Sequence, residues 1–272
     1  MHSVASASPA AAPPVPLLGA YQIAKTYGED SEAPNPVIGD ITFSLNRGEI
    51  VSIVGPSGCG KTTFLNVLCG LIQLTRGRVA WRGTPLAGMP TRVGYMLQKD
   101  LLLPWRTALG NVMLGLEVQG VSRRLRTERA HAMLRTVGLD GFDSYYPSSL
   151  SGGMRQRVAL ARTLVMDPEV LLLDEPFAAL DFQTKLVLEG DMARLVRSEG
   201  RAVLMITHDV EEAVSLSDRV IVLTHRPSCI RAVHDIALGT DRGDMMAARE
   251  SPGFVHYVRT IWSELQVRAT DG

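Results

Sequence analysis

Short apolar runs alternate with stretches of helical pattern along most of the chain from Leu17 onward. Continuous apolar runs of this kind, placed between helices, are typical of strands buried on both faces of a parallel sheet. The pattern therefore predicts an α/β fold built on a mostly parallel sheet. The runs with strand character lie at residues 21–27, 37–45, 49–55, 170–174, 202–208 and 219–224, and a helix is predicted from Lys61.

The strand pattern is interrupted between about Lys99 and Ser149. Residues 127–139 instead place apolar side chains at helical spacing, which predicts a helical subdomain at about residues 99–153, inserted into the α/β core. A second irregular stretch, Gly28 to Pro36, is acidic and carries proline breakers between two strand-like runs. This stretch predicts a surface hairpin loop.

The two ends of the chain differ from the main domain, which we expect at residues 17–230. Residues 1–16 are rich in Ala, Pro and Ser, and we expect a flexible tail because they bury too little to order themselves. Residues 231–272 end in a helical pattern and are expected to pack on the main domain. The sequence has no apolar run of about 18 residues and no signal-peptide pattern, so we expect any membrane role to depend on a partner.

Composition argues against several classes of protein. The 272 residues are 46% hydrophobic, which is enough for a sizeable core. The 28 Lys and Arg residues balance the 28 Asp and Glu residues, so no net field attracts the protein to nucleic acid or to an anionic bilayer. The three cysteines lack C-x-x-C spacing, which argues against a disulfide framework or a zinc site and favours a reducing cytosol.

A glycine-rich turn follows the apolar run at residues 49–55 and opens the predicted helix. It fits the pattern G-x-x-x-x-G-K-[ST], whose glycines let backbone N–H groups converge on phosphate oxygens at a helix N-terminus. The lysine of this pattern reaches the β- and γ-phosphates, and its threonine hydroxyl ligates Mg²⁺. The turn therefore predicts nucleotide binding by Gly55, Pro56, Ser57, Gly58, Cys59, Gly60, Lys61, Thr62 and Thr63.

Polar side chains follow two later apolar runs, at the sheet edge where parallel strands place their ligands. Asp174 and Glu175 come directly after four apolar residues. Neighbouring strand residues point in opposite directions, so we expect Asp174 to hold Mg²⁺ through water and Glu175 to face the attacking water, as general base or to orient it. His208 ends the run at 202–208, and we expect it to contact a γ-phosphate.

A second glycine turn, Ser151-Gly152-Gly153, leads into another helical pattern. Ser151 is a good N-cap for a helix that begins near Gly153 or Met154. The two glycines leave the backbone open, which is again the geometry of an anion site at a helix N-terminus. One such turn is enough to hold the phosphates of a nucleotide, so the role of the second is not given by local pattern alone.

The order of these motifs resembles the ATP-binding cassette family over about residues 17–230. The resemblance implies a P-loop NTPase core with a mostly parallel sheet, an antiparallel β subdomain and an inserted α-helical subdomain. It also implies ATPase activity with ATP and Mg²⁺. The motifs that carry it are the loop at Gly55, Gln98, LSGGMRQR at 150–157, LLLDEP at 171–176, AALD at 178–181 and His208.

The resemblance implies further roles for individual residues. Two cassettes of this family pack head to tail, so that the first turn of one chain and residues 151–153 of the other grip one ATP. A second copy of the chain is therefore an expected partner. Tyr27 is expected to stack on the adenine, Gln98 to contact Mg²⁺ and the attacking water, and Asp181 to communicate across the dimer interface.

Hydrolysis must drive a second process, and the preferred interpretation is import across a membrane. Residues 102–107, LLPWRT, and the RP turn within residues 223–230 resemble importers of the nitrate, sulfonate and taurine type. We expect the chain to lie peripherally on the cytoplasmic face of the cell membrane, docked on a separate permease and served indirectly by a solute-binding protein. The apolar residues expected at the permease are Leu101, Leu102, Leu103 and Trp105.

Other functions are weighed against this one. A cassette that acts on nucleic acid or ribosomes is opposed by the charge balance, and no nucleic-acid partner is expected. A small-molecule kinase has no use for residues 150–157 or for His208. An ABC ATPase that is not coupled to transport is the alternative, and nitrate, sulfonates, taurine and pyrimidine-like compounds all stay open as solutes.

Overall fold

The computed structural model describes residues 15–86, 88, 92–241 and 243–266. Most of the tail expected at residues 1–16 therefore lies outside the described residues. The strands are β1 (Leu18–Tyr27), β2 (Asn35–Leu45), β3 (Ile50–Val54), β4 (Arg76–Trp81), β5 (Thr84–Pro85), β6 (Val93–Met96), β7 (Val170–Asp174), β8 (Ala202–Ile206), β9 (Arg219–Leu223) and β10 (Ile230–Asp235). The helices are α1 (Lys61–Leu68), α2 (Ala108–Val112), α3 (Leu114–Val118), α4 (Arg123–Thr136), the 3-10 helix η1 (Pro147–Ser149), α5 (Gly152–Leu164), α6 (Phe182–Glu199), α7 (Val210–Leu216), α8 (Met245–Glu250) and α9 (Phe254–Gln266).

The larger of two sheets confirms the mostly parallel sheet that the apolar runs predict. Its order is β10-β9-β3-β8-β7-β6, and the pairs from β9 to β6 are parallel. Every residue of β3, β7 and β8 is buried, which explains why these strands are continuous apolar runs in the sequence. Because these strands are parallel, the residues that follow them meet at one edge of the sheet.

The smaller sheet is antiparallel, in the order β2-β1-β4-β5. β1 pairs with β2 across the loop at residues 28–34, which confirms the expected hairpin. One apolar cluster joins β1 and β2 to α1 and to β3, and within it the rings of Phe43 and Phe64 meet edge to face with centroids 5.9 Å apart. The start of α1 is therefore fixed against both sheets.

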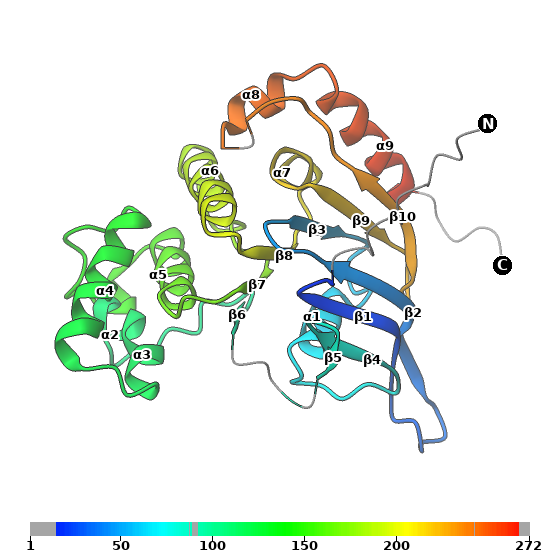
Figure 1. Cartoon of the computed structure of the whole chain (residues 1–272), viewed down its shortest axis with the longest axis horizontal. Helices are drawn as coiled ribbons and strands as arrows, with labels where there is room; N and C mark the ends of the chain where they lie inside the picture. Colours follow the sequence, from blue (N-terminus) through cyan, green and yellow to red (C-terminus); the bar gives the residue numbers. More distant parts are fainter. Residues whose placement is uncertain (1–14, 87, 89–91, 242, 267–272) are drawn as a thin grey trace, which may run out of the picture.

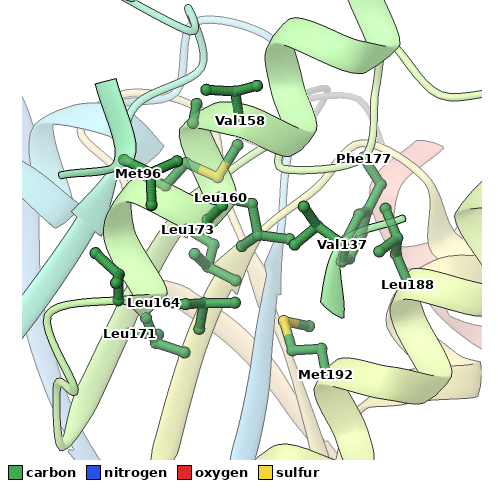
Figure 2. Packing of buried hydrophobic residues seen from close by; sticks show 14 of the residues in the cluster. Met96, Val137, Val158, Leu160, Leu164, Leu171, Leu173, Phe177, Leu188 and Met192 are labelled. Carbon is green, nitrogen blue, oxygen red and sulfur yellow. The ribbon is translucent and has the colours of Figure 1, made fainter. Parts of the chain in front are cut away.

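Helices α2 to α5 form a group at one end of the molecule, to the left in Figure 1. Their apolar core continues into β7 and α6: Leu160 and Leu164 of α5 lie beside Leu171 and Leu173 of β7 in Figure 2. Burial of one such leucine side chain contributes about 1.5–3 kcal/mol. This packing holds α5, which begins at the second glycine turn, against the strand that ends at Asp174.

The main sheet continues past the boundary expected at residue 230. β10 starts at that residue and pairs antiparallel with β9, at the edge of the larger sheet. Its residues alternate between half-buried and exposed and include charged side chains, so no apolar run marks this strand in the sequence. Helix α9 then packs Phe254 and Ile261 into a cluster with Val214 of α7 and Val220 of β9.

Candidate nucleotide site

The first glycine turn joins the buried end of β3 to the start of α1. Gly58 and Gly60 have φ angles of 74° and 113°, in the left-handed region that favours glycine. Gly60 is confined by space as well, because a Cβ there would come within 2.7 Å of Val37 Cγ1. The turn therefore depends on glycine to lead the chain around the N-terminus of α1, where backbone N–H groups favour an anion.

A cleft of about 230 Å³ opens beside this turn. It brings together residues from the first turn and from the ends of β6, β7, β8 and β9, as the parallel sheet requires. The lining residues are Ser57, Gly58, Gly60, Lys61, Thr62, Thr63, Gln98, Asp174, Glu175, Ile206 and Arg226. Most of the residues expected at the phosphates, the metal and the attacking water therefore share one cleft.

Lys61 extends back over the turn that precedes it. Its Nζ donates hydrogen bonds to the carbonyl oxygens of Gly55 and Pro56, at 2.8 and 3.0 Å. Cys59 is 1% exposed and belongs to the apolar cluster that joins α1 to the two sheets. Burial raises the pKa of the Cys59 thiol, and nearby Lys61 and Arg226 partly oppose this.

Thr62 and Asp174 lie side by side in the cleft. Thr62 Oγ1 donates a hydrogen bond to Asp174 Oδ2 at 2.8 Å. Burial raises the pKa of Asp174; the Thr62 hydrogen bond lowers it, and the charge of Glu175 raises it further. A hydroxyl and a carboxylate are hard oxygen donors of the kind that Mg²⁺ prefers alongside phosphate oxygens, so this pair fits that ion.

Glu175 is the point where the three expected catalytic side chains meet. Its carboxylate accepts a hydrogen bond from Gln98 Nε2 at 2.8 Å, and His208 Nδ1 lies 3.4 Å from its other oxygen. The Glu175 backbone has a φ of 51°, held by a hydrogen bond from its N–H to the Ile206 carbonyl at 2.9 Å. A non-glycine residue in this region stores strain, which is common where a side chain must be aimed at a ligand.

The second glycine turn does not line this cleft. Ser151 caps α5 by accepting a hydrogen bond from the Met154 N–H at 3.2 Å, so the helix begins at Gly152, slightly earlier than expected. Ser151 and Gly152 are exposed. A Cβ at Gly153 would lie 3.2 Å from the Ala179 carbonyl, so the turn packs on the segment that leads to Asp181. Within one chain, residues 151–153 thus lie outside the lining of the cleft beside the phosphate-binding loop.

Two residues expected to act at the edges of the site lie outside the cleft lining as well. Tyr27 ends β1 with 39% of its surface exposed, and the Lys25 ammonium lies 5.1 Å from its ring centroid. Asp181 caps α6 by accepting a hydrogen bond from the Thr184 N–H at 3.0 Å, and hydrogen bonding at Thr184 lowers the pKa of Asp181. The contact of Tyr27 with adenine and the role of Asp181 at a dimer interface therefore stay predictions.

Arg226 is a lining residue that sequence reasoning missed. It follows β9 within the RP turn, for which the sequence indicates only a resemblance to importers. The available signal was its position, because β9 is parallel to β3 and ends at the same edge of the sheet. An arginine just past that edge is placed to meet a ligand there.

Comparison with known proteins places these features in a family. The ABC transporter family model matches residues 38–178. The chain is 44% identical over 227 residues to an uncharacterized ABC transporter ATP-binding protein of Methanocaldococcus jannaschii, which covers 84% of this chain and 83% of that protein. It is 41% identical over 230 residues to the taurine import ATP-binding protein TauB of Pseudomonas fluorescens, with 85% and 86% covered. With TauB of Escherichia coli K12 the identity is 42% over 192 residues, with 71% and 75% covered.

Solved structures share the fold. A dimeric structure of a bacterial ABC transporter cassette matches with a TM-score of 0.75 and 30% identity, over 81% of this chain and 99% of that one. A dimeric post-hydrolysis state of an ATP-binding cassette, bound to ADP and phosphate, matches with a TM-score of 0.73 and 29% identity over the same shares. The expected P-loop NTPase core is therefore confirmed.

Proposed function

Because the chain belongs to the ABC transporter family of ATP-binding proteins, we propose that it is the ATPase subunit of an importer for a small solute. In this proposal two copies pack head to tail around two ATP molecules and drive a separate membrane permease. The family itself establishes the coarser statement: the chain is an ABC ATPase that binds and hydrolyses ATP. The dimer, the permease and the solute are the proposed part.

The observation that carries the proposal is the meeting of Gln98 and His208 at Glu175, beside the phosphate-binding loop. A carboxylate held by two polar partners at this position is suited to orient a water and accept its proton as the γ-phosphate leaves. His208 keeps 67% of its side chain exposed, so it is free to reach a phosphate oxygen. We assign general-base chemistry to Glu175, and orientation of water and phosphate to Gln98 and His208.

We assign phosphate binding to residues 55–63 and metal binding to Thr62, Gln98 and Asp174. When bound, Mg²⁺ supplies charge neutralisation between the β- and γ-phosphates. Lys61 must exchange its two carbonyl partners for phosphate oxygens, which are stronger acceptors because they are charged. Tyr27, exposed at the end of β1, supplies an aromatic face for the adenine in this proposal.

The exposed second turn supports the proposed dimer. Residues 151–153 carry a capped helix N-terminus of the anion-binding kind but do not line the cleft of their own chain. A head-to-tail partner would bring its own Ser151 turn to the γ-phosphate held by this chain. The matched cassette structures are described as dimeric, which agrees with this arrangement.

The proposed permease contact is the segment that follows Gln98. Trp105 is 70% exposed and Leu101 is 54% exposed, whereas Leu102 is buried and Leu103 is half-buried. We therefore assign the docking surface to Leu101 and Trp105 rather than to all four apolar residues. Leu102 belongs to the core of the helical group, and Leu103 is half-buried. The buried Asn111 side chain bonds the Leu103 N–H and carbonyl and the Arg106 carbonyl, so Trp105 projects from a rigid turn.

In the described part of the chain, no helix has the length and apolar character needed to cross a bilayer. We place the protein peripherally at the cytoplasmic face of the cell membrane, with the solute-binding protein acting through the permease. The TauB proteins are named for taurine import. A sulfonate of that kind is therefore one candidate for the solute here, beside nitrate and pyrimidine-like compounds.

The proposal is tested by expressing the chain with its candidate permease and reconstituting the purified complex in liposomes. We expect ATP-dependent uptake of one solute class, and phosphate released to water at a rate that rises with permease and loaded binding protein. ATP hydrolysis by the free chain without any capture by a permease would instead favour an ABC ATPase that is not coupled to transport.

A further inference from the structure

The turn after β9, residues 224–229, is built against the phosphate-binding loop. The buried Ser228 donates its N–H to the Val37 carbonyl at 3.0 Å, and its own carbonyl accepts from the Gly39 N–H at 2.8 Å. Within the turn, Thr224 Oγ1 accepts a hydrogen bond from the Cys229 N–H at 2.9 Å. Val37 is also the residue against which Gly60 packs. The turn and the loop therefore share a wall and hold a fixed relative position.

Arg226 stands at the tip of this turn and lines the same cleft as Ser57, Gly58 and Lys61. Its side chain is exposed and makes no hydrogen bond or ion pair with any residue in the described ranges. Its charge nevertheless reaches the loop, since it opposes the rise in the pKa of the Cys59 thiol that burial causes. The cleft is thus lined by an arginine that pairs with no carboxylate among the described residues, although Asp174 and Glu175 line the same space.

We propose that Arg226 binds phosphate oxygens of the nucleotide, as a second cation beside Lys61. It does so from the side of the loop opposite to His208. The side follows from the sheet order, because β9 and β8 flank β3, and Arg226 and His208 follow these two strands. The planar guanidinium offers paired N–H donors that match phosphate oxygens. This assignment rests on the proposed nucleotide site and adds a residue to it.

The position of Arg226 also separates nucleotide binding from the chemical step of hydrolysis. The groups around the attacking water, Glu175, Gln98 and His208, converge on the β7 and β8 side of the loop. Arg226 approaches from the β9 side, where it can hold phosphates but does not touch the carboxylate that acts on water. It therefore contributes to the affinity for nucleotide, and not to the rate of the chemical step.

The test uses the full chain with Arg226→Gln. Dissociation constants for MgADP, and for MgATP in a Glu175→Gln background, are measured by titration calorimetry. We expect both to rise about tenfold, as for loss of one hydrogen bond to a charged group, and KM to rise with them while kcat stays within about twofold. Arg226→Lys keeps the charge and is expected to restore part of the affinity, and high salt is expected to narrow the gap between Arg226→Gln and wild type.

Arg129→Gln is the matched control, since Arg129 is an exposed arginine on α4, and it is expected to bind like wild type. Thermal unfolding without nucleotide checks the fold of each variant, and Arg226→Gln is expected to melt like wild type. Unchanged dissociation constants in Arg226→Gln, or a lower kcat with unchanged binding, would overturn this inference alone. Failure of the wild-type chain to bind or hydrolyse ATP would overturn the proposed function instead.

Discussion

Gln98 Nε2 donates a hydrogen bond to Glu175 Oε2 at 2.8 Å, and this contact links the loop after β6 to the end of β7. The same loop continues through Asp100, whose carboxylate pairs with Arg155 Nε of α5 at 3.0 Å. It then reaches the exposed Trp105. Glu175, α5 and the proposed permease surface are therefore joined by one short segment of chain.

Replacing Glu175 with Gln is expected to stop turnover while preserving binding. The amide keeps the size of the side chain but cannot accept a proton, and a general base contributes about 10²- to 10⁴-fold to rate. We expect phosphate release to fall at least about 100-fold, with the MgATP dissociation constant within a few-fold of wild type. Phosphate release and calorimetry measure the two quantities. Wild-type turnover by this variant would contradict the role assigned to Glu175.

Replacing Lys61 with Ala is expected to weaken ATP binding at least about tenfold, because a charge-assisted hydrogen bond to phosphate is lost. The two carbonyls that Lys61 now bonds belong to the half-buried Gly55 and Pro56 beside the open cleft, so water can replace the ammonium. The fold should therefore survive, and thermal unfolding without nucleotide provides the control. Binding of MgATP at wild-type affinity would exclude Lys61 from the phosphate site.

Much of the fold and the centre of the site could be predicted because their signals are local. β3, β7 and β8 are buried along their whole length, so they are continuous apolar runs, and the residues after parallel strands must meet at one edge. β10 could not be found this way, because Arg231, His234 and Asp235 interrupt its apolar positions. Its place depends on pairing with β9, a contact that no pattern within the strand records.

The sequence also does not show in which direction each side chain points, or which distant residues share a cleft. Four apolar residues near position 103 look equivalent in the sequence, but Leu102 packs inward while Trp105 projects outward. Arg226 lies more than 160 residues from Lys61, and only the β3–β9 pairing brings both to one cleft. The partner of the Ser151 turn lies on another chain in the proposed dimer, so neither a single sequence nor a single chain contains it.

Replacing Trp105 with Ala is expected to weaken permease capture and leave the ATPase activity of the free chain unchanged. The indole is 70% exposed, so its loss removes contact area from the surface rather than from the core. Co-purification with the permease measures docking, and phosphate release measures activity. Trp262→Ala on α9, where the side chain is 45% exposed, is the matched control and should dock normally. Equal recovery of the permease by the Trp105 variant would remove this surface from the proposal.

Mixing two inactive chains is expected to restore ATP trapping if each site is shared between copies. Lys61→Ala damages the phosphate-binding loop, and Gly152→Asp places a negative charge in the second turn. Gly152 has room for a side chain, because a Cβ there would meet only the Arg155 guanidinium, at 3.9 Å.

Each variant alone should trap no ATP. Random pairing of equal amounts leaves one intact site in half of the dimers, so trapping should reach roughly a quarter of wild type, measured with radiolabelled ATP. A mixture as inactive as its components would argue that each chain builds its own site.

A buried group of charges lies behind His208 and ties α6 and α7 to α8. Lys185 Nζ is 2.6 Å from Asp209 Oδ2 and 2.5 Å from Glu212 Oε2. The Glu189 carboxylate is fully buried and makes no hydrogen bond with any residue that the structure describes, and Lys185 and the Arg249 guanidinium are each 3.8 Å away. Burial, reinforced by the charge of Glu212, raises the pKa of Glu189 to about 8. In the folded chain the Glu189 carboxyl therefore favours its protonated form at neutral pH.

Replacing Glu189 with Gln is expected to remove a pH dependence of stability. The pKa of Glu189 is raised from 4.5 in the unfolded chain to about 8 in the folded chain, so between these values the folded chain binds more protons. The free energy of unfolding must then fall as pH rises through this window. Glutamine is neutral throughout, so we expect Glu189→Gln to gain stability over wild type from pH 5 to pH 8, by roughly 4 kcal/mol at the upper end. Urea unfolding at several pH values measures this, and Glu128→Gln, at an exposed position of α4, should follow wild type. Parallel stability profiles for Glu189→Gln and wild type would mean that Glu189 is already ionised in the folded protein.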